Sequence, residues 1–278
     1  MQPIKPIFTA LFCAAVLAYS ATASAALGNA KSGLEAAGKV DLDGFGAGAP
    51  QSSKIETETD LPFDRSIVTV ADAQPGLYDY FASADVGNLA LKVAGSLTNS
   101  GGSTLSGVEV GLLRATSEVR DVITLTTTRT DSFDVTLELI VNGNITAGAG
   151  SSASANSVLQ FGTDPGTNSF DSNRYGVGAI SDTLSITKTV SGSEINMDFQ
   201  AFLSFSVGQV AAGDTVTGEL NNTAIIKLIL PQGVTVTGSQ SGTFGVPIPT
   251  PVPEPETFAL MTAGLALLLG ATFKRRRR

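Results

Sequence analysis

Two segments of the chain alternate apolar and polar residues over a long stretch. Apolar residues occupy every second position from Phe133 to Val141, and again from Ile195 to Val207. Successive side chains of a β-strand point to opposite faces, so this alternation predicts a strand with one buried face, whereas an amphipathic helix would need a period of 3.6 residues. The high content of Val and Thr also disfavours a helix. Both segments are therefore predicted to be long, half-buried strands.

Shorter apolar runs predict further strands on both sides of these two. They span residues 67–70, 77–82, 89–93, 108–113, 122–127, 184–190, 224–230 and 234–237. Turn residues stand between them, for example at 99–102, 164–166 and 231–233. Many short strands with such punctuation are typical of an antiparallel β-sandwich, which we expect over residues 66–246.

Three segments lack this pattern. Residues 26–65 are rich in Gly, Ala, Ser and acidic residues and are expected to be irregular, although residues 34–40 could form one or two turns of helix. Residues 147–156 are predicted to be a flexible loop or an edge strand of small residues. Residues 247–252 contain alternating prolines, which predict an extended spacer in the polyproline conformation.

The first 25 residues have the features of a secretory signal peptide. Lys5 precedes an apolar stretch at residues 7–18, which is too short to cross a membrane. Small residues then alternate, as signal peptidase requires at the positions −3 and −1 of its cleavage site. The preferred site places Ala23 and Ala25 there, and residues 21–23 form a second candidate. This segment has no twin arginine, which favours the general secretory route.

Residues 257–273 form an uncharged apolar run that is followed by five basic residues. As a helix this run would be about 26 Å long, close to the ~30 Å thickness of a hydrocarbon core. Cations next to a membrane helix stay on the cytoplasmic side, so the pattern predicts a transmembrane helix with its tail inside and the body outside. The basic stop consists of Lys274, Arg275, Arg276, Arg277 and Arg278.

Pro253, Glu254 and Pro255 stand directly before this predicted helix. The order of tripeptide, helix and basic tail over residues 253–278 resembles the PEP-CTERM sorting signal of Gram-negative bacteria. This resemblance implies that an exosortase, a membrane-embedded transpeptidase, recognises the signal and removes the tail. It also implies an association with exopolysaccharide production and biofilm formation, but no biochemical activity. The alternative is an ordinary membrane anchor preceded by a chance Pro-Glu-Pro.

The composition removes several classes of functional site. The chain has no His and no Trp, and its single Cys, Cys13, lies in the predicted signal peptide. Histidine-dependent catalysis, thiolate chemistry, disulfides and Cys/His zinc sites are therefore excluded from the mature chain. Between the targeting segments the net charge is about −12, which argues against binding to nucleic acid or to anionic lipid.

Little catalytic or metal-binding chemistry remains. Carboxylate pairs and a Ser–Lys dyad are the remaining options, but the chain is poor in the aromatic platforms of glycosidases, so no catalytic residue is assigned. Acidic residues at 41–43, at 131–134 and at Asp164 with Asp171 could donate oxygens to calcium, but none follows the EF-hand pattern, so no metal site is assigned. Arg114 and Arg120 are interpreted as charges on a strand face.

These observations predict an exported, all-β protein of the cell envelope or extracellular matrix that has no catalytic activity and no cofactor. Its expected partners are signal peptidase, an exosortase, the membrane before processing, and exopolysaccharide, and no nucleic acid. It would be anchored in the inner membrane before processing and would then reach the cell surface or the medium. The alternative is a β-sandwich module that binds carbohydrate or calcium on its loops. An enzyme with paired carboxylates is a third, less favoured interpretation.

Overall fold

The computed structural model describes residues 32–42, 51–107, 111–163 and 168–245, and these residues form strands, turns and loops. They lie within one compact unit of the chain that ends at Pro247. None of the described residues belongs to a helix long and apolar enough to cross a membrane. Several predicted features lie outside the described residues, namely the transmembrane helix at 257–273, the tripeptide at 253–255, the basic stop at 274–278, and Ala23 and Ala25 of the signal cleavage site.

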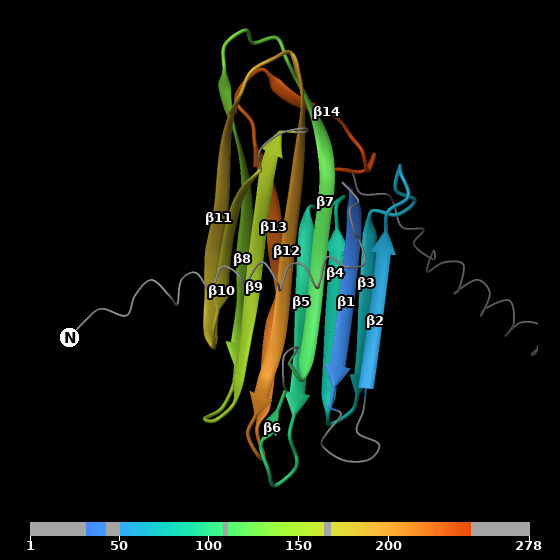
Figure 1. Ribbon diagram of the computed structural model, residues 1–278, viewed down its shortest axis with the longest axis vertical. Helices are drawn as coiled ribbons and strands as arrows, with labels where there is room; N and C mark the ends of the chain where they lie inside the picture. The colour runs from blue at the N-terminus through green and yellow to red at the C-terminus, as the bar shows by residue number, and fades with distance from the viewer. Residues whose placement is uncertain (1–31, 43–50, 108–110, 164–167, 246–278) are drawn as a thin grey trace, which may run out of the picture. The chain divides into compact units, whose positions relative to one another are not determined.

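The strands of this unit form two antiparallel sheets (Figure 1). The larger sheet has eight strands, six of them in the order β10 (Ser169–Tyr175), β9 (Ser152–Thr163), β12 (Glu194–Val210), β7 (Leu113–Thr127), β1 (Gly33–Asp41) and β2 (Gln51–Glu58). Its two remaining strands are β14 (Val234–Ser239), paired with β7, and β6 (Leu105–Ser106), paired with β12. The smaller sheet has six strands in the order β11 (Gly178–Val190), β8 (Phe133–Thr146), β13 (Thr215–Ile229), β5 (Ala90–Thr98), β4 (Tyr78–Asp85) and β3 (Ile67–Gln74).

The two sheets pack face to face around one apolar core, so the predicted β-sandwich is confirmed (Figure 1). The two long alternating segments are β8 and β12, and they lie in opposite sheets. Their inward-facing apolar residues belong to the same core cluster, among them Val135, Leu139, Phe199 and Phe205. The period of two therefore predicted correctly which side chains face inward on both strands.

Small residues set the distance between the sheets at two places. Phe205 of β12 faces Gly218 of β13, where an added Cβ atom would lie 2.3 Å from Cε2 of the ring. Tyr80 of β4 faces Gly38 of β1 in the same way, with an added Cβ atom 2.0 Å from Cε2. Any side chain at these glycines would occupy the space of a buried ring, so glycine is needed for packing and not for a turn.

The structure corrects two expectations about segments without a clear pattern. Residues 26–65 were expected to be irregular, with a turn or two of helix at 34–40, but β1 and β2 occupy 33–41 and 51–58. In β1 the small residues Ala36 and Gly38 stand at inward positions and conceal the alternation. In β2 all side chains except Ile55 are polar, most of them including Ile55 are exposed, and pairing with β1 defines the strand. Residues 152–156, expected to lie in a loop or an edge strand, begin β9, which lies between β10 and β12.

Hydrogen bonds between the sheets close the edge formed by β10 and β11. Asp182 on β11 accepts bonds from the side-chain amide of Asn173 (2.6 Å) and the hydroxyl of Tyr175 (3.0 Å), both on β10. Asp171 on β10 accepts a bond from the backbone N–H of Ser185 on β11 (3.1 Å). The bond from Asn173 is the main reason why the pKa of Asp182 lies below its ordinary value. The Asp171 bond also occupies a backbone donor on β11 that could otherwise pair with another strand.

The edge formed by β2 and β3 is closed by a second carboxylate. Asp72 on β3 accepts hydrogen bonds from the hydroxyl of Ser52 and from Lys54 (3.1 Å), both on β2, and from the hydroxyl of Tyr78 (3.2 Å) on β4. The bond from Ser52, followed by that from Lys54, lowers the pKa of Asp72 to about 2. Carboxylates therefore join the two sheets at both open sides of the sandwich, Asp182 and Asp171 at one side and Asp72 at the other.

Candidate functional site

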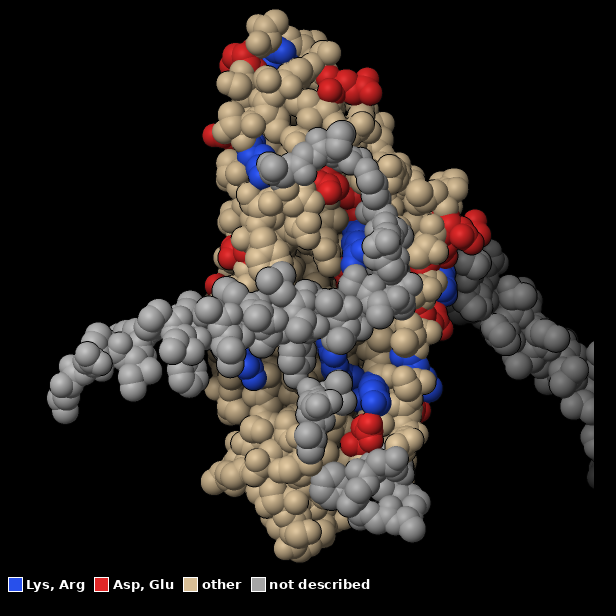
Figure 2. Space-filling model, in the orientation of Figure 1, with Lys and Arg blue, Asp and Glu red and all other residues tan. Residues whose placement is uncertain are grey.

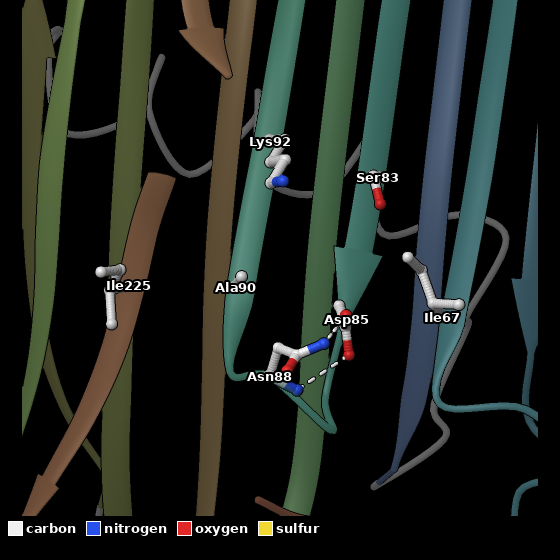
Figure 3. A pocket seen from close by; sticks show the side chains of 7 residues that line it. All are labelled: Ile67, Ser83, Asp85, Asn88, Ala90, Lys92 and Ile225. Atoms are coloured by element: carbon white, nitrogen blue, oxygen red, sulfur yellow. Dashed lines mark hydrogen bonds between the residues drawn. The ribbon is translucent and has the colours of Figure 1, made fainter. Parts of the chain in front are cut away.

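A hollow of about 240 Å³ lies on the outer face of the six-stranded sheet (Figure 3). We call it the Lys92 groove. It is lined by Ile67, Ser83, Asp85, Asn88, Ala90, Lys92 and Ile225. These residues come from β3, β4, the turn between β4 and β5, β5 and β13.

Strand alternation and register bring these side chains together. Asp85 of β4 stands opposite Ile67 of β3 on one side and opposite Ala90 of β5 on the other. Ser83 stands opposite Lys92, and Ala90 stands opposite Ile225 of β13. The residues that alternate with them along the strands point into the core and are buried, as Ala84, Leu91 and Ala224 are. Apart from Asn88 in the turn, the residues that line the groove therefore occupy outward positions of four neighbouring strands.

An irregularity in β13 lies directly beside the groove. Leu220 pairs with Val93 and Ala224 with Leu91, so the backbone of residues 221–223 stands opposite Lys92 alone. Extra residues of this kind bend the strand that contains them and interrupt the ladder of hydrogen bonds. A hollow next to Lys92 is consistent with this local departure from a regular sheet.

The turn between β4 and β5 holds the acidic side of the groove in place. The carboxylate of Asp85 accepts hydrogen bonds from the backbone N–H of Asn88 (2.9 Å) and from its side-chain amide (2.7 Å), as Figure 3 shows. Leu89, the next residue, has a φ of 53°, a left-handed conformation that is unusual for a bulky side chain. Strained backbone of this kind tends to occur at functional sites.

The basic side of the groove has a different character. The side chain of Lys92 makes no hydrogen bond and no ion pair with any other residue that the structure describes. Ser83 stands opposite it, but the hydroxyl of Ser83 is bonded to the hydroxyl of Thr69 (3.1 Å) and not to the lysine. The pair therefore lacks the hydrogen bond that a Ser–Lys dyad needs for catalysis. The ammonium group of Lys92 offers three hydrogen-bond donors to a ligand.

The acidic residues considered as calcium ligands do not converge within the described residues. Asp131 pairs with Arg129 (2.6 Å), and Asp134 accepts a hydrogen bond from Thr189 (2.6 Å). Asp171 bonds to Ser185 at the β10–β11 edge, whereas residues 43 and 164 lie outside the described ranges. Within those ranges no three Asp, Glu, Cys or His side chains are arranged to hold a metal ion.

The outer face of the eight-stranded sheet contains the arginines considered above. Arg114 and Arg120 occupy outward positions of β7, as predicted. Arg120 forms an ion pair with Glu118, which also accepts a hydrogen bond from Gln200 (2.7 Å). Burial raises the pKa of Glu118 above its ordinary value. In the view of Figure 2 basic and acidic side chains are scattered among other residues and form no large patch of one sign.

Sequence reasoning did not single out any residue of the Lys92 groove. The available signals were weak: a short turn at 85–89 and one lysine in an otherwise apolar strand. Neither indicates that β13 joins the consecutive strands β3, β4 and β5, because β13 pairs with β5 from a segment far along the chain.

Comparison with solved structures gives only distant similarities. One is the carbohydrate-binding module TmCBM61 in complex with beta-1,4-galactotriose, at 10% identity over 59% of this chain and 88% of that chain, with a TM-score of 0.21. Another is a carbohydrate-binding module of the β-sandwich superfamily, at 13% identity over 72% and 75% of the two chains, with a TM-score of 0.20. Similarities of this strength support no conclusion about function.

A third structure is the enzymatically active domain of tailspike protein 4 from bacteriophage CBA120, at 12% identity over 59% of this chain, with a TM-score of 0.22. This chain spans only 19% of that domain, so its enzymatic activity is not transferable here. No curated protein matches the chain in sequence.

The match at the C-terminal segment is specific. Residues 251–278 match the family model of the PEP-CTERM protein-sorting motif. The matched range contains the Pro253–Glu254–Pro255 tripeptide, the apolar run at 257–273 and the basic stop at 274–278, in the order that the sequence indicated. The chain therefore carries a PEP-CTERM protein-sorting motif at residues 251–278.

Proposed function

We propose that the chain is an exported protein that an exosortase sorts to the cell surface or the surrounding matrix, where it acts without catalysis. The PEP-CTERM motif at residues 251–278 is the observation that supports this proposal. We include in this proposal that the protein associates with exopolysaccharide and biofilm. That part rests on the resemblance of residues 253–278 to the PEP-CTERM sorting signal.

In this proposal signal peptidase cleaves after Ala25 and the body crosses the inner membrane. The apolar run at 257–273 then stops in the membrane because the cations at 274–278 favour the cytoplasmic side. The exosortase recognises Pro253, Glu254 and Pro255 and removes the tail. The helix alone would retain any chain in the membrane, so the tripeptide is needed only for processing.

The body of the chain supports a non-catalytic role. The carboxylates of Asp72 and Asp182 use their oxygens to join the two sheets. The Ser83 and Lys92 pair is not hydrogen-bonded as a catalytic dyad would be. These features suit a stable structural or binding domain better than an enzyme.

The test is to replace Pro253, Glu254 and Pro255 by alanines and express the chain in cells with and without an exosortase. The mass of the C-terminal fragment and membrane fractionation report processing. We expect the parent to be cut only when the exosortase is present and the variant to remain inserted and uncut. A matched control replaces residues 247–249 by alanines, which changes the spacer but leaves the motif intact. If the variant with the altered tripeptide is processed like the parent, the segment is an ordinary anchor and the proposal is wrong.

A second candidate function is carbohydrate binding by the β-sandwich. The observation that favours it is the Lys92 groove, where a donor, an acceptor and apolar side chains meet on an outward sheet face. A glycan array probed with the full chain in detergent tests this candidate directly. No signal for any glycan would exclude it, whereas the sorting proposal would stand.

A further inference from the structure

We infer that the Lys92 groove binds one sugar residue that carries a methyl group, such as a 6-deoxyhexose or an N-acetylhexosamine. This inference rests on the second candidate function, carbohydrate binding, and names the site and the ligand class. The size of the groove, its apolar lining, its polar groups and its charge each restrict the ligand.

The size of the groove fits a small ligand. Its volume of about 240 Å³ is below the ~300–1,000 Å³ that pockets for drug-sized ligands enclose. One sugar residue, at the end of a chain or on a branch, would occupy it.

The apolar lining of the groove is aliphatic. Ile67 and Ile225 stand on opposite sides of it with Ala90 between them (Figure 3), and Ile225 leaves 42% of its surface exposed to solvent. No aromatic residue lines the groove, so it offers no flat platform on which a sugar ring could stack. Aliphatic side chains gain most by covering an apolar group of the ligand, and on a sugar that group is the methyl of a 6-deoxy position or of an acetyl substituent.

The polar groups of the groove can bind two adjacent hydroxyl groups of a sugar. Asp85 can only accept hydrogen bonds when ionised, and its position is fixed by two bonds from Asn88. Lys92, two positions along the neighbouring strand from the partner of Asp85, can only donate. A ligand hydroxyl can donate to the carboxylate while its neighbour accepts from the ammonium group. Because the turn already holds Asp85, little freedom is lost when a ligand binds.

Charge selects against an ionised ligand. The groove contains one carboxylate and one ammonium group, so its own formal charge is balanced. The surrounding body is acidic, with a net charge of about −12, and repels polyanions. A neutral sugar is therefore favoured over a uronic acid.

The experiment measures the affinity of the full chain in detergent for free sugars by ligand-observed NMR titration. The probes are L-rhamnose, L-fucose and N-acetylglucosamine, each compared with a neutral analogue that lacks the methyl, namely L-mannose, L-galactose and N-formylglucosamine. Burial of one methyl group corresponds to about a fourfold lower Kd, because a buried carbon of this kind contributes about 0.8 kcal/mol. L-rhamnose and L-fucose test the methyl of a 6-deoxy position, whereas N-acetylglucosamine tests the methyl of an acetyl group.

Two variants locate the site. Lys92→Met keeps most of the apolar stem and removes the donor, and we expect it to raise Kd at least about tenfold, as the loss of a hydrogen bond to a charged group does. Ile225→Ser should abolish the preference for methyl-bearing sugars while sugars without the methyl bind as before. Lys227→Met is the matched control, because Lys227 lies on the same face of β13 but outside the groove and near Glu138 (3.7 Å). It should bind like the parent.

Each outcome decides between the inference and the function on which it rests. If Lys92→Met binds sugars like the parent, the inference is wrong, but carbohydrate binding at another place survives. If methyl-bearing and methyl-free sugars bind the parent equally, the assigned ligand class is wrong. If no sugar binds on the array or in the titration, the inference and carbohydrate binding both fail.

Discussion

The packing of Phe205 against Gly218 predicts a measurable cost for one added methyl group. A Cβ atom at Gly218 would lie 2.3 Å from Cε2 of Phe205, 2.4 Å from Cδ2 and 2.5 Å from Cζ, whereas ordinary contacts begin at 3.4 Å. The ring would have to shift by about 1 Å inside a core that is packed as densely as an organic crystal. We expect Gly218→Ala to lower the free energy of unfolding by about 1–3 kcal/mol. The lower unfolded-state entropy of alanine offsets up to about 1 kcal/mol of that loss.

Urea denaturation of residues 26–246 measures this loss, and a double-mutant cycle identifies its cause. Phe205→Leu removes the ring atoms that lie nearest to the added methyl. In that background Gly218→Ala should therefore cost about 1–2 kcal/mol less than in the parent. Gly102→Ala is the control, because a Cβ atom there would meet nothing within 4 Å. Equal costs of Gly218→Ala in both backgrounds would show that the Phe205 ring is not the obstacle.

Three further predictions concern the core and two carboxylates. Phe199→Ala removes a ring that contacts Phe244 edge-on (5.5 Å between centroids) and should lower the free energy of unfolding by ~3–5 kcal/mol. The control Ser206→Ala, at an outward position of β12, should lower it by less than about 0.5 kcal/mol. Similar losses for the two variants would refute the register of β12. Asp72, with its pKa lowered to about 2, stabilises the fold above its unfolded pKa of about 4 and loses that contribution as pH falls towards 2, so Asp72→Asn should flatten the acid part of a stability profile. Burial raises the pKa of Asp121, so its ionised form costs stability at neutral pH and protonation relieves that cost; urea titrations should show Asp121→Asn gaining on the parent from pH 4 to pH 7.

The sequence predicted the fold where burial leaves a strong pattern. In β8 and β12 large apolar residues occupy the inward positions, so the period of two is visible in the sequence. In β1 the inward positions include Ala36 and Gly38, and Gly38 is small because the ring of Tyr80 fills the space above it. That requirement comes from the opposite sheet, so no local pattern could reveal β1. The edge strand β2 has no buried apolar face at all, and only its pairing with β1 identifies it.

The candidate site depends even more on long-range structure. Asp85 and Asn88 form a local turn that the sequence could suggest, but Ile225 reaches the groove from a segment far along the chain. The irregularity between Leu220 and Ala224 shifts the register of β13 by the same two residues against β5 and against β8. A single sequence contains no sign of that shift. The sorting motif is the opposite case, since tripeptide, helix and basic tail are consecutive and can be read directly.

Closed edges and a locally irregular face together indicate where a partner would meet this sandwich. The end strands of the two main strand orders, β10 and β2 in one sheet and β11 and β3 in the other, are joined in pairs through Asp182 and Asp72, which hinders the addition of a further strand there. Recognition is then left to the sheet faces. On the six-stranded face the backbone departs from regular geometry at Leu89 and beside Lys92, and both places border the same groove. Register shifts also interrupt the pairs β12–β9 and β14–β7, but beside the groove the shift in β13 coincides with the left-handed backbone of Leu89, and strained backbone of this kind tends to occur at functional sites.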